Sequence, residues 1–495
     1  MIYHWLGDKN FRTGVSNYLR KYELKAASTE DLWDSLEEVS GNEKFNIKKL
    51  PVRKLGEQWT SQINFPLVSV ELIAPTKIKI SQTSVCPQNK KDSEDQIWMI
   101  PLTISVNETV QKILLEQKTI EMTVPENAII NLNKNVTAFI RTKYDKDLFE
   151  RLISENGKKL LNSHDFRQLQ SDFFFLANNL NDYAKDYNLG DYMTFVLKYF
   201  AGGQGDSIPF DSGVYCEIFS NLEKISPIIT KLGLSDIQTK LLEKFYQSLI
   251  ADLDVEGSFK NGDIFSPLKD LSTQSSFDKE LLRKILLSKA IGSGNQEFIM
   301  RASELFNDNG KSNITADPKL EPVILQGYLK AGDNLQNLID SYSKIDINLQ
   351  SKVENYRRAI VGQLSDPTLL DDIINNFIFN KDLVGTSERA YSLMLAPNCV
   401  KNSEFDNYFG NYFLPNFMKI TEEFRSTQFL YKGIINSNIS LVCDAGQLQS
   451  FQKIVEENQI KECANAIKQA CEDARNNILV IEQQGEEIKR SLVNF

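Results

Sequence analysis

Over residues 1–60, hydrophobic positions recur with the 3.6-residue period of an amphipathic helix. Ser28 and Asp31 have the spacing of a capping box, which predicts that a helix begins at this point. The apolar residues that follow share one face of this helix: Leu32, Trp33, Leu36 and Val39. Because such a face is unstable in water, we expect it to pack against another part of a protein.

Between about residue 61 and residue 145 the period changes from 3.6 to 2, which is typical of β-strands. One strand is predicted around Val68 and Val70. A second has one side formed by Trp98, Ile100, Leu102, Ile104 and Val106. Further strands are predicted at Lys77 to Val85, Thr119 to Val124 and Val136 to Lys143. Several short antiparallel strands separated by turn-rich segments predict a small β-sandwich.

From residue 146 to residue 495 the helical period returns and is interrupted repeatedly by Gly, Pro or Asn. Ser235-x-x-Gln238 predicts one helix start. Asp366-Pro367 predicts another, with a capping carboxylate before a proline at the first helical position. A further apolar stripe contains Leu281, Leu282, Ile285 and Leu286. Because no strict repeat aligns, we expect an irregular α-solenoid of stacked hairpins, similar to HEAT or armadillo folds, with a concave surface.

The expected fold class is therefore mainly α with a small all-β domain, divided at 1–60, 61–145 and 146–495. The 495 residues, with 41% hydrophobic and 25% charged positions, are typical of a folded globular protein. An excess of 66 acidic over 56 basic residues argues against nucleic acid as a partner. No apolar stretch is long enough to predict a membrane span.

Histidine gives the first test for catalytic chemistry. The chain has two, His4 and His164, far apart in the sequence. A zinc-hydrolase helix needs two imidazoles one turn apart and a nearby Glu, and this H-E-x-x-H motif is absent. His164 precedes Asp165 as in half of a catalytic dyad, but an Asp at a helix start is an ordinary cap. We therefore interpret neither histidine as catalytic or metal-binding.

Two other patterns have both a functional and a structural interpretation. The cluster Gly202-Gly203-Gln204-Gly205-Asp206 could be a phosphate-binding loop, but helices are predicted on both sides, which favours an interhelical loop. The pairs Lys48-Lys49 and Arg53-Lys54, with Trp59 nearby, could bind an anion. Acidic residues close by favour an ordinary solvated face.

Cysteine and aromatic residues add no chemistry. Cys463 and Cys471 are two helical turns apart, too far for a disulfide within one helix, so we expect them to pack as thiols. The run Phe173-Phe174-Phe175 is interpreted as core. No catalytic residue and no metal ligand is therefore predicted in this chain, and the sequence does not identify substrate-binding residues.

Several segments, taken in order, resemble one known family. The quoted segments are Leu6-Gly7-x-x-x-Phe11-x-x-Gly14-Val15-x-x-Tyr18-Leu19, Asp31-Leu32-Trp33-x-x-Leu36, Trp59-Thr60-x-Gln62-x-x-Phe65-Pro66-Leu67-Val68, Trp98-x-Ile100-Pro101-Leu102-Thr103, Asn135-x-Thr137-x-Phe139-Ile140-Arg141-x-x-Tyr144-Asp145 and Asp165-x-x-Gln168-Leu169-x-x-Asp172. They resemble the C-terminal half of the zinc aminopeptidases of the puromycin-sensitive, endoplasmic-reticulum and aminopeptidase N types. The resemblance extends to Asn477-Ile478 and Ile488. At Ser81-Gln82-Thr83 the family's usual Arg-Phe after the Gln is missing.

The resemblance implies that catalysis and substrate enclosure are carried out by different parts of the family's chain. The family's zinc ligands and catalytic residues would precede residue 1, so zinc is expected in the full-length family and no cofactor in this chain. Residues 146–495 would enclose a peptide and restrict access to the active site. The alternatives are a stand-alone, catalytically dead module that pairs with peptides or an intact paralogue, and an unrelated helical scaffold. A homodimer and the compartment stay open, with the cytoplasm as the default.

Overall fold

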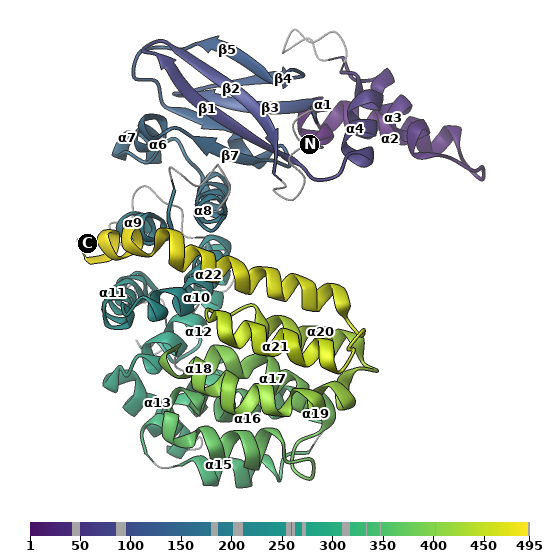
Figure 1. Ribbon diagram of the computed structural model, residues 1–495. Helices are drawn as coiled ribbons and strands as arrows, with labels where there is room; N and C mark the ends of the chain where they lie inside the picture. Colours follow the sequence, from purple (N-terminus) through teal and green to yellow (C-terminus); the bar gives the residue numbers. More distant parts are fainter. Residues whose placement is uncertain are drawn as a thin grey trace. The chain divides into compact units, whose positions relative to one another are not determined.

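The computed structural model describes residues 1–41, 50–85, 96–179, 187–200, 211–253, 259, 263–269, 274–308, 317–332, 334–346, 348–400 and 402–493. Helices predominate, and the named strands of this described part all lie between Pro66 and Tyr144 (Figure 1). The expectation of a mainly helical chain with a small sheet domain is therefore confirmed. The chain divides into two compact units, of which the first contains Met1–Leu176 and the second contains Phe210–Phe495.

The first unit begins with four helices: α1 (Ile2–Leu6), α2 (Asp8–Lys21), α3 (Thr29–Glu38) and α4 (Val52–Ser61). The predicted capping box is present, because the Asp31 N–H donates to the Ser28 hydroxyl at 3.3 Å and the Ser28 N–H donates to the Asp31 carboxylate at 2.8 Å. Leu36 is buried in a small core, against which Leu32 and Trp33 pack. This core is shared with the sheets, because Met99 is buried in it and Leu114 packs against it.

Two glycines allow these helices to approach each other closely. A Cβ atom at Gly14 in α2 would lie 2.9 Å from a Leu36 methyl group, and one at Gly56 in α4 would lie 2.5 Å from the Trp33 ring. Real side chains do not tolerate such distances. Helices α2 and α4 can therefore pack against α3 only because both positions lack a side chain.

The strands of the first unit form two sheets. They are β1 (Pro66–Ala74), β2 (Lys77–Ser84), β3 (Ile100–Val106), β4 (Thr109–Leu115), β5 (Thr119–Thr123), β6 (Ile130–Leu132) and β7 (Arg141–Tyr144). The four-stranded sheet has the order β5-β2-β1-β7, and the three-stranded sheet has the order β4-β3-β6. The expectation of antiparallel strands holds for every pair except β1 and β7, which run parallel.

The predicted strand from Val136 to Lys143 is wrong over its first half. The chain forms a short 3₁₀ turn at Lys134–Val136, and the strand begins only at Arg141. Asn133, Asn135 and Val136 have φ values of 57°, 62° and 53°, a left-handed conformation that a strand does not contain. The buried Asn133 amide fixes this turn through hydrogen bonds to both the N–H and the C=O of Ala138.

Gln82 joins the two sheets from inside the first unit. Its side chain accepts from the Trp98 N–H and donates to the Trp98 carbonyl, both at 2.9 Å, and also donates to the Gln117 carbonyl at 3.0 Å. Gln82 lies in β2, whereas Trp98 leads into β3 and is fully buried. The missing Arg-Phe after Gln82 therefore leaves this connection intact.

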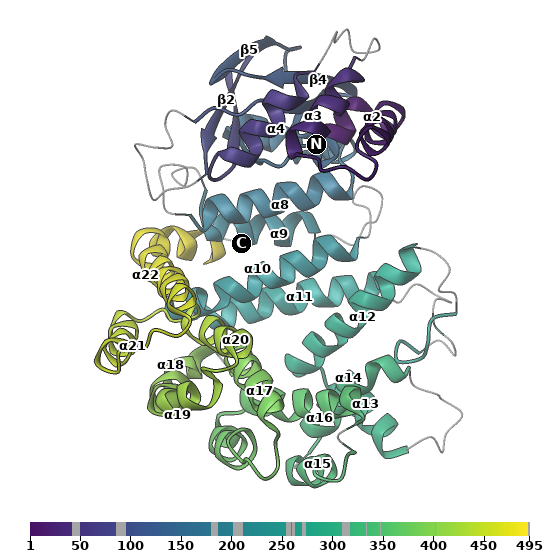
Figure 2. The same ribbon diagram turned by 90° about the vertical axis from the view of Figure 1, so that its right-hand side faces the viewer.

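Three helices follow the sheets: α6 (Lys146–Leu152), α7 (Glu155–Lys158) and the longer α8 (Ser163–Ala177). The helices of the second unit are α9 (Leu189–Phe200), α10 (Ser212–Lys231), α11 (Ser235–Leu253), α12 (Gln274–Gly292), α13 (Gln296–Asp308), α14 (Glu321–Lys330), α15 (Leu335–Tyr342), α16 (Gln350–Gly362), α17 (Thr386–Cys399), α18 (Phe405–Tyr408), α19 (Leu414–Phe424), α20 (Gln428–Ile439), α21 (Ala445–Glu457) and α22 (Ala464–Val493). Pairs that are close in sequence pack together, including α11 with α12, α13 with α14 and α16 with α17 (Figure 2).

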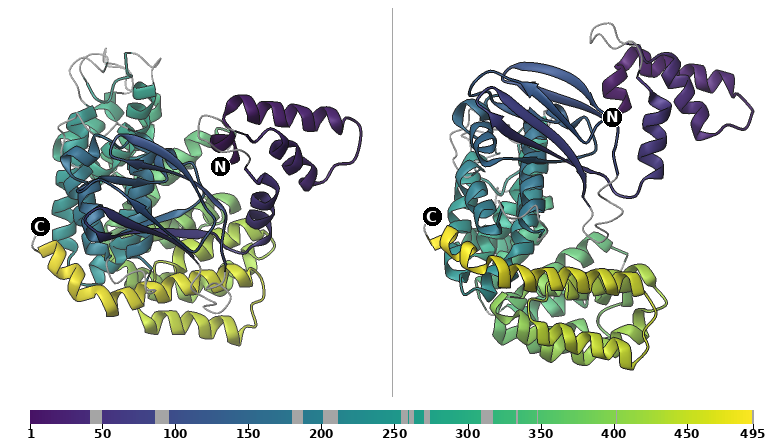
Figure 3. Two further views of the ribbon diagram at one scale, coloured as in Figure 1. Left: turned by 90° about the horizontal axis from the view of Figure 1, so that it is seen from above. Right: turned by 45° about the horizontal axis from the view of Figure 1, so that its top comes forward.

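The long helix α22 connects distant parts of the second unit. It packs against α9, α10, α20 and α21, and Figure 3 shows it running beside α21. The buried Gln484 side chain accepts from the Leu189 N–H at 3.3 Å and donates to the Ala177 carbonyl at 3.0 Å. The last helix of the chain therefore holds the first residues of this unit in place.

The predicted helix starts are only partly correct. Asp366 accepts from the Thr368 N–H at 3.0 Å, but a 3₁₀ turn (Pro367–Leu369) and a π-helix (Asp372–Ile378) follow instead of a regular α-helix. Ser235 is the first residue of α11 rather than its cap, and its hydroxyl donates to Thr230. In α12, Leu282 and Leu286 are buried, whereas Leu281 is exposed.

Candidate functional site

Neither histidine belongs to a described group of residues that could bind a metal ion. His4 is exposed in α1, where partial burial, the chain amino group and Lys112 lower its pKa. His164 is exposed at the start of α8. Within the described ranges, no three His, Cys, Asp or Glu residues lie close enough together to hold a metal ion.

Asp165 acts as a structural cap rather than as the partner of His164. Its carboxylate accepts from the Asn162 N–H at 3.0 Å, the Asn135 N–H at 2.7 Å and the Lys134 ammonium group at 2.5 Å. The Asp165 N–H donates in return to the Asn162 side chain at 3.0 Å. These bonds fix the start of α8 beside the 3₁₀ turn. Because the Asp165 carboxylate is used in them, we assign it no role in a dyad with His164.

The other patterns of interest are structural where they can be described. Arg53 forms ion pairs with Asp34 at 2.9 Å and Glu57 at 3.0 Å on an exposed face. Cys463 immediately precedes α22 and Cys471 is buried within it, and both are free thiols. Phe173 and Phe174 are buried in α8. The cluster Gly202-Gly203-Gln204-Gly205-Asp206 and the pair Lys48-Lys49 lie outside the described residues.

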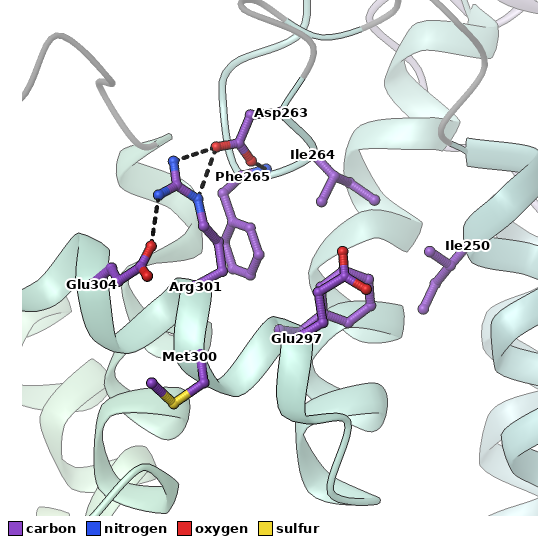
Figure 4. A pocket seen from close by; sticks show the side chains of 9 residues that line it. Ile250, Asp263, Ile264, Phe265, Glu297, Met300, Arg301 and Glu304 are labelled. Carbon is purple, nitrogen blue, oxygen red and sulfur yellow. Dashed lines mark hydrogen bonds and ion pairs between the residues drawn. The ribbon is translucent and has the colours of Figure 1, made fainter.

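The second unit contains a cavity of about 640 Å³. It is lined by Ile250 near the end of α11, by Asp263, Ile264 and Phe265 of the following segment, and by Glu297, Phe298, Met300, Arg301 and Glu304 of α13. We call it the α13 pocket. Figure 4 shows Arg301 and Glu304 of α13 on one side, Ile250 and Ile264 on the other, and Glu297 between them.

Arg301 is held by two carboxylates of the α13 pocket. Its guanidinium donates to Asp263 at 2.6 Å and 3.1 Å and to Glu304 at 3.1 Å. The hydrogen bond to Asp263 raises the pKa of Arg301 further, so the group stays charged. Asp263 also accepts from the Phe265 N–H at 2.8 Å, which ties the ion pair to the backbone of the opposite wall.

Glu297 differs from the other two carboxylates. It is exposed in the first turn of α13 and forms no hydrogen bond or ion pair with any residue that the structure describes. Its carboxylate points toward the middle of the pocket in Figure 4. Glu297 is therefore available to a cationic group that enters the pocket.

A buried arginine holds the wall opposite α13. Arg283 of α12 is fully buried and donates to the carbonyl oxygens of Ser266 at 2.5 Å and Ile264 at 3.2 Å. The same guanidinium binds Asp317 at 2.5 Å and Glu280 at 2.8 Å. The Asp317 N–H donates in turn to the Phe265 carbonyl at 2.9 Å. Arg283 thus fixes the segment that supplies Asp263, Ile264 and Phe265.

A second cavity of about 500 Å³ lies elsewhere in the unit. Its lining includes the buried Arg389, which forms an ion pair with Glu423 and donates to the Val384 carbonyl at 2.5 Å. Lys381 also approaches Glu423, at 3.4 Å. Lys419 and Glu422 also line this cavity, so three cationic side chains face two carboxylates in its described lining and the net charge is small.

Sequence reasoning missed the α13 pocket. Glu297, Arg301 and Glu304 have the spacing of one helix face, and this signal was present in the sequence. The contribution of Asp263 was not, because that residue reaches Arg301 only through the tertiary fold.

No described helix is both long enough and apolar enough to cross a membrane.

Comparison with known proteins places the chain in a family. Residues 129–476 match the ERAP1-like C-terminal domain, and residues 1–59 match the peptidase family M1 domain. Aminopeptidase 2 of Candida albicans is 28% identical over 393 residues, covering 78% of this chain and 38% of the relative. Aminopeptidase N of Lactococcus lactis subsp. cremoris is 25% identical over 403 residues, covering 79% and 42%.

A third relative matches a similar share of this chain. The puromycin-sensitive aminopeptidase of Caenorhabditis elegans is 20% identical over 408 residues, covering 79% of this chain and 39% of the relative. The chain thus spans about two-fifths of the length of these relatives. It belongs to the family of the ERAP1-like C-terminal domain and corresponds to the C-terminal part of an M1 aminopeptidase.

Proposed function

We propose that this chain is the non-catalytic C-terminal portion of a zinc aminopeptidase-like protein, and that it holds and encloses peptide substrates. Removal of N-terminal amino acids would then occur at residues that precede residue 1. One observation carries this proposal: the match to the M1 peptidase domain is confined to residues 1–59, whereas the match to the C-terminal domain covers 129–476.

The residues of this chain do not fit a catalytic zinc site. A catalytic zinc has three protein ligands, which in the H-E-x-x-H hydrolases include two histidines one turn apart on a helix. Here His4 lies in α1 and His164 lies in α8, and each is exposed. No step of catalysis is therefore assigned to these residues.

The three-part division proposed from sequence gives each part a role. Residues 1–60 would be the helical end of the catalytic domain, 61–145 a β-sandwich, and 146–495 an α-solenoid. The hydrogen bonds of Gln82 between the two sheets support the sandwich. The packing of neighbouring helix pairs along the second unit supports the solenoid.

Exposed apolar residues near the N-terminus support a missing partner surface. Leu19 and Leu24 are 62% and 102% exposed, and both belong to the stretch that matches the M1 peptidase domain. Burial of such side chains against a partner would remove apolar surface from water, which is favourable. We infer that the upstream catalytic part would cover them.

The test combines turnover with binding. The purified chain, prepared with zinc present, is offered aminoacyl reporter substrates with and without a chelator, and fluorescent peptides in a polarisation titration. We expect peptide binding without release of amino acids. Chelator-sensitive turnover would refute the non-catalytic assignment, and failure to bind any peptide would refute the enclosing role.

A further inference from the structure

We propose that the α13 pocket binds the side chain of a lysine or arginine residue. That the natural carrier of this side chain is a peptide rests on the function proposed above. The inference goes beyond general enclosure, because it assigns a chemical preference to one location of the second unit.

The charge of the lining favours a cation. Three carboxylates, of Asp263, Glu297 and Glu304, face one guanidinium, that of Arg301. Arg301 already has both Asp263 and Glu304 as partners, at 2.6 Å and 3.1 Å. The described lining of the pocket therefore has an excess of negative charge, and within it Glu297 is the carboxylate without a cationic partner among the described residues.

The apolar part of the lining suits a long aliphatic stem. Ile250, Ile264 and Phe265 are buried in the lining. Ile250 and Ile264 lie on the side away from Arg301 and Glu304, and the Phe265 ring packs on Phe298 of α13 at 6.2 Å between ring centroids. Lysine and arginine place hydrocarbon against apolar surface while the charged end reaches polar groups. The volume of about 640 Å³ lies within the range of small-molecule sites, and a single side chain with its flanking peptide units fits into it.

The wall that a ligand would meet is fixed before binding. Arg283 holds the Ile264 and Ser266 carbonyls, and Asp263 holds the Phe265 N–H. A pre-formed wall reduces the ordering cost of binding. The hydrogen bond from the Phe265 N–H also sets the position of Asp263. A second cation can therefore bind Glu297 while Arg301 keeps its ion pairs with Asp263 and Glu304.

Glu297 also has an ordinary structural role. A carboxylate in the first turn stabilises a helix through its dipole. This role alone predicts no ligand, so a test must separate it from binding. Asp236 provides a matched control, because it occupies the same second position in α11, is exposed and does not line the pocket.

The experiment uses Met300, which lines the pocket and is 53% exposed, as a reporter. The chain has 7 methionines, so methyl-¹³C methionine labelling gives a simple spectrum, and Met300→Leu assigns the signal. Two probes are titrated: Nα-acetyl-lysine amide and its neutral analogue Nα-acetyl-norleucine amide. The full chain, Glu297→Gln and Asp236→Asn are compared.

We expect the lysine probe to shift the Met300 signal with an affinity about two- to fivefold higher than the norleucine probe, as for a partly exposed ion pair. Glu297→Gln should remove this difference, Asp236→Asn should keep it, and added salt should reduce it. Equal affinities in the full chain, or a preference that survives Glu297→Gln, would overturn the proposal. Because the probes are single residues, a lysine preference without long-peptide binding would refute the enclosing role alone.

Discussion

The Arg283 guanidinium and the Asp317 carboxylate form an ion pair of 2.5 Å inside the second unit, with the arginine fully buried. Arg283 also holds the backbone carbonyls of Ile264 and Ser266. One buried cation therefore connects α12, the 3₁₀ turn at Pro318–Leu320 that leads into α14, and the wall of the α13 pocket. This makes the pair a point where stability and the geometry of the pocket can be tested together.

Replacement of Arg283 by Met should strongly destabilise the second unit. The substitution leaves Asp317 and two carbonyl groups buried without their donor, and loss of one partner of a buried pair costs about 3–5 kcal/mol. Arg358→Met is the control, because the exposed Arg358–Glu354 pair contributes about 0.3–0.5 kcal/mol. Denaturant unfolding measures both. Equal, small losses for the two variants would contradict the role given to Arg283.

The same pair should give the chain a specific sensitivity to acid. Burial alone would raise the pKa of Asp317, but hydrogen bonds from the Lys319 N–H and the Arg283 guanidinium outweigh it and lower this pKa. A carboxylate with a lowered folded pKa stabilises the protein above its unfolded value of about 3.9, and this contribution is lost as the pH falls through the folded pKa.

Asp317→Asn provides the measurement for this acid sensitivity. The variant should be less stable than the wild-type chain at neutral pH, and its free energy of unfolding should fall less steeply below about pH 4. Parallel pH profiles for the two proteins would show that Asp317 titrates alike in the folded and unfolded states.

Gln82 should be essential for the connection between the two sheets. Gln82→Met preserves much of the side-chain volume but leaves the N–H and the carbonyl of Trp98 without their partner. Each unsatisfied buried polar group costs about 1–3 kcal/mol. The exposed Gln111 of β4 is the control, and Gln111→Met should change the unfolding free energy of the first unit by less than about 0.5 kcal/mol. If Gln82→Met left the unfolding free energy of the first unit unchanged, this would argue against a connection between the two sheets through Gln82.

Amide hydrogen exchange should distinguish the N-terminal helices from the sheets. We expect α2 (Asp8–Lys21), which carries the exposed Leu19, to exchange faster than β3 (Ile100–Val106), which is buried throughout. Slow exchange is also expected after residue 146. Mass spectrometry of peptic fragments measures all three regions, and uniform protection would contradict a missing partner for the first helices.

The sequence predicted best those features that depend on local periodicity. The capping box at Ser28 and a strand at Ile100–Val106 both appear in the structure, because each is determined by residues close in the chain. In β3 the polar positions Thr103 and Ser105 are buried as well. Alternation therefore identified the strand but underestimated its burial, because the segment at Thr137, whose hydroxyl donates to the Thr103 hydroxyl at 2.9 Å, packs on the polar face.

Features that depend on unusual backbone conformation or distant contacts were not predictable. Asn133 and Asn135 adopt left-handed conformations that interrupt an apparently regular strand. The π-helix at Asp372–Ile378 buries Ile373, Ile374 and Phe377, but with a wider turn than that of the α-helix expected after Asp366-Pro367. The α13 pocket needs Asp263 beside Arg301 and Arg283 beside Ser266, and neither contact leaves a pattern in the sequence.

Native mass spectrometry tests the central claim most directly, because one spectrum reports bound zinc, bound peptide and the length of that peptide. The chain, prepared with zinc present and mixed with a peptide of about ten residues, should appear as a complex with the intact peptide and without zinc. A zinc-bound chain carrying peptides shortened from their N-terminus would contradict the account.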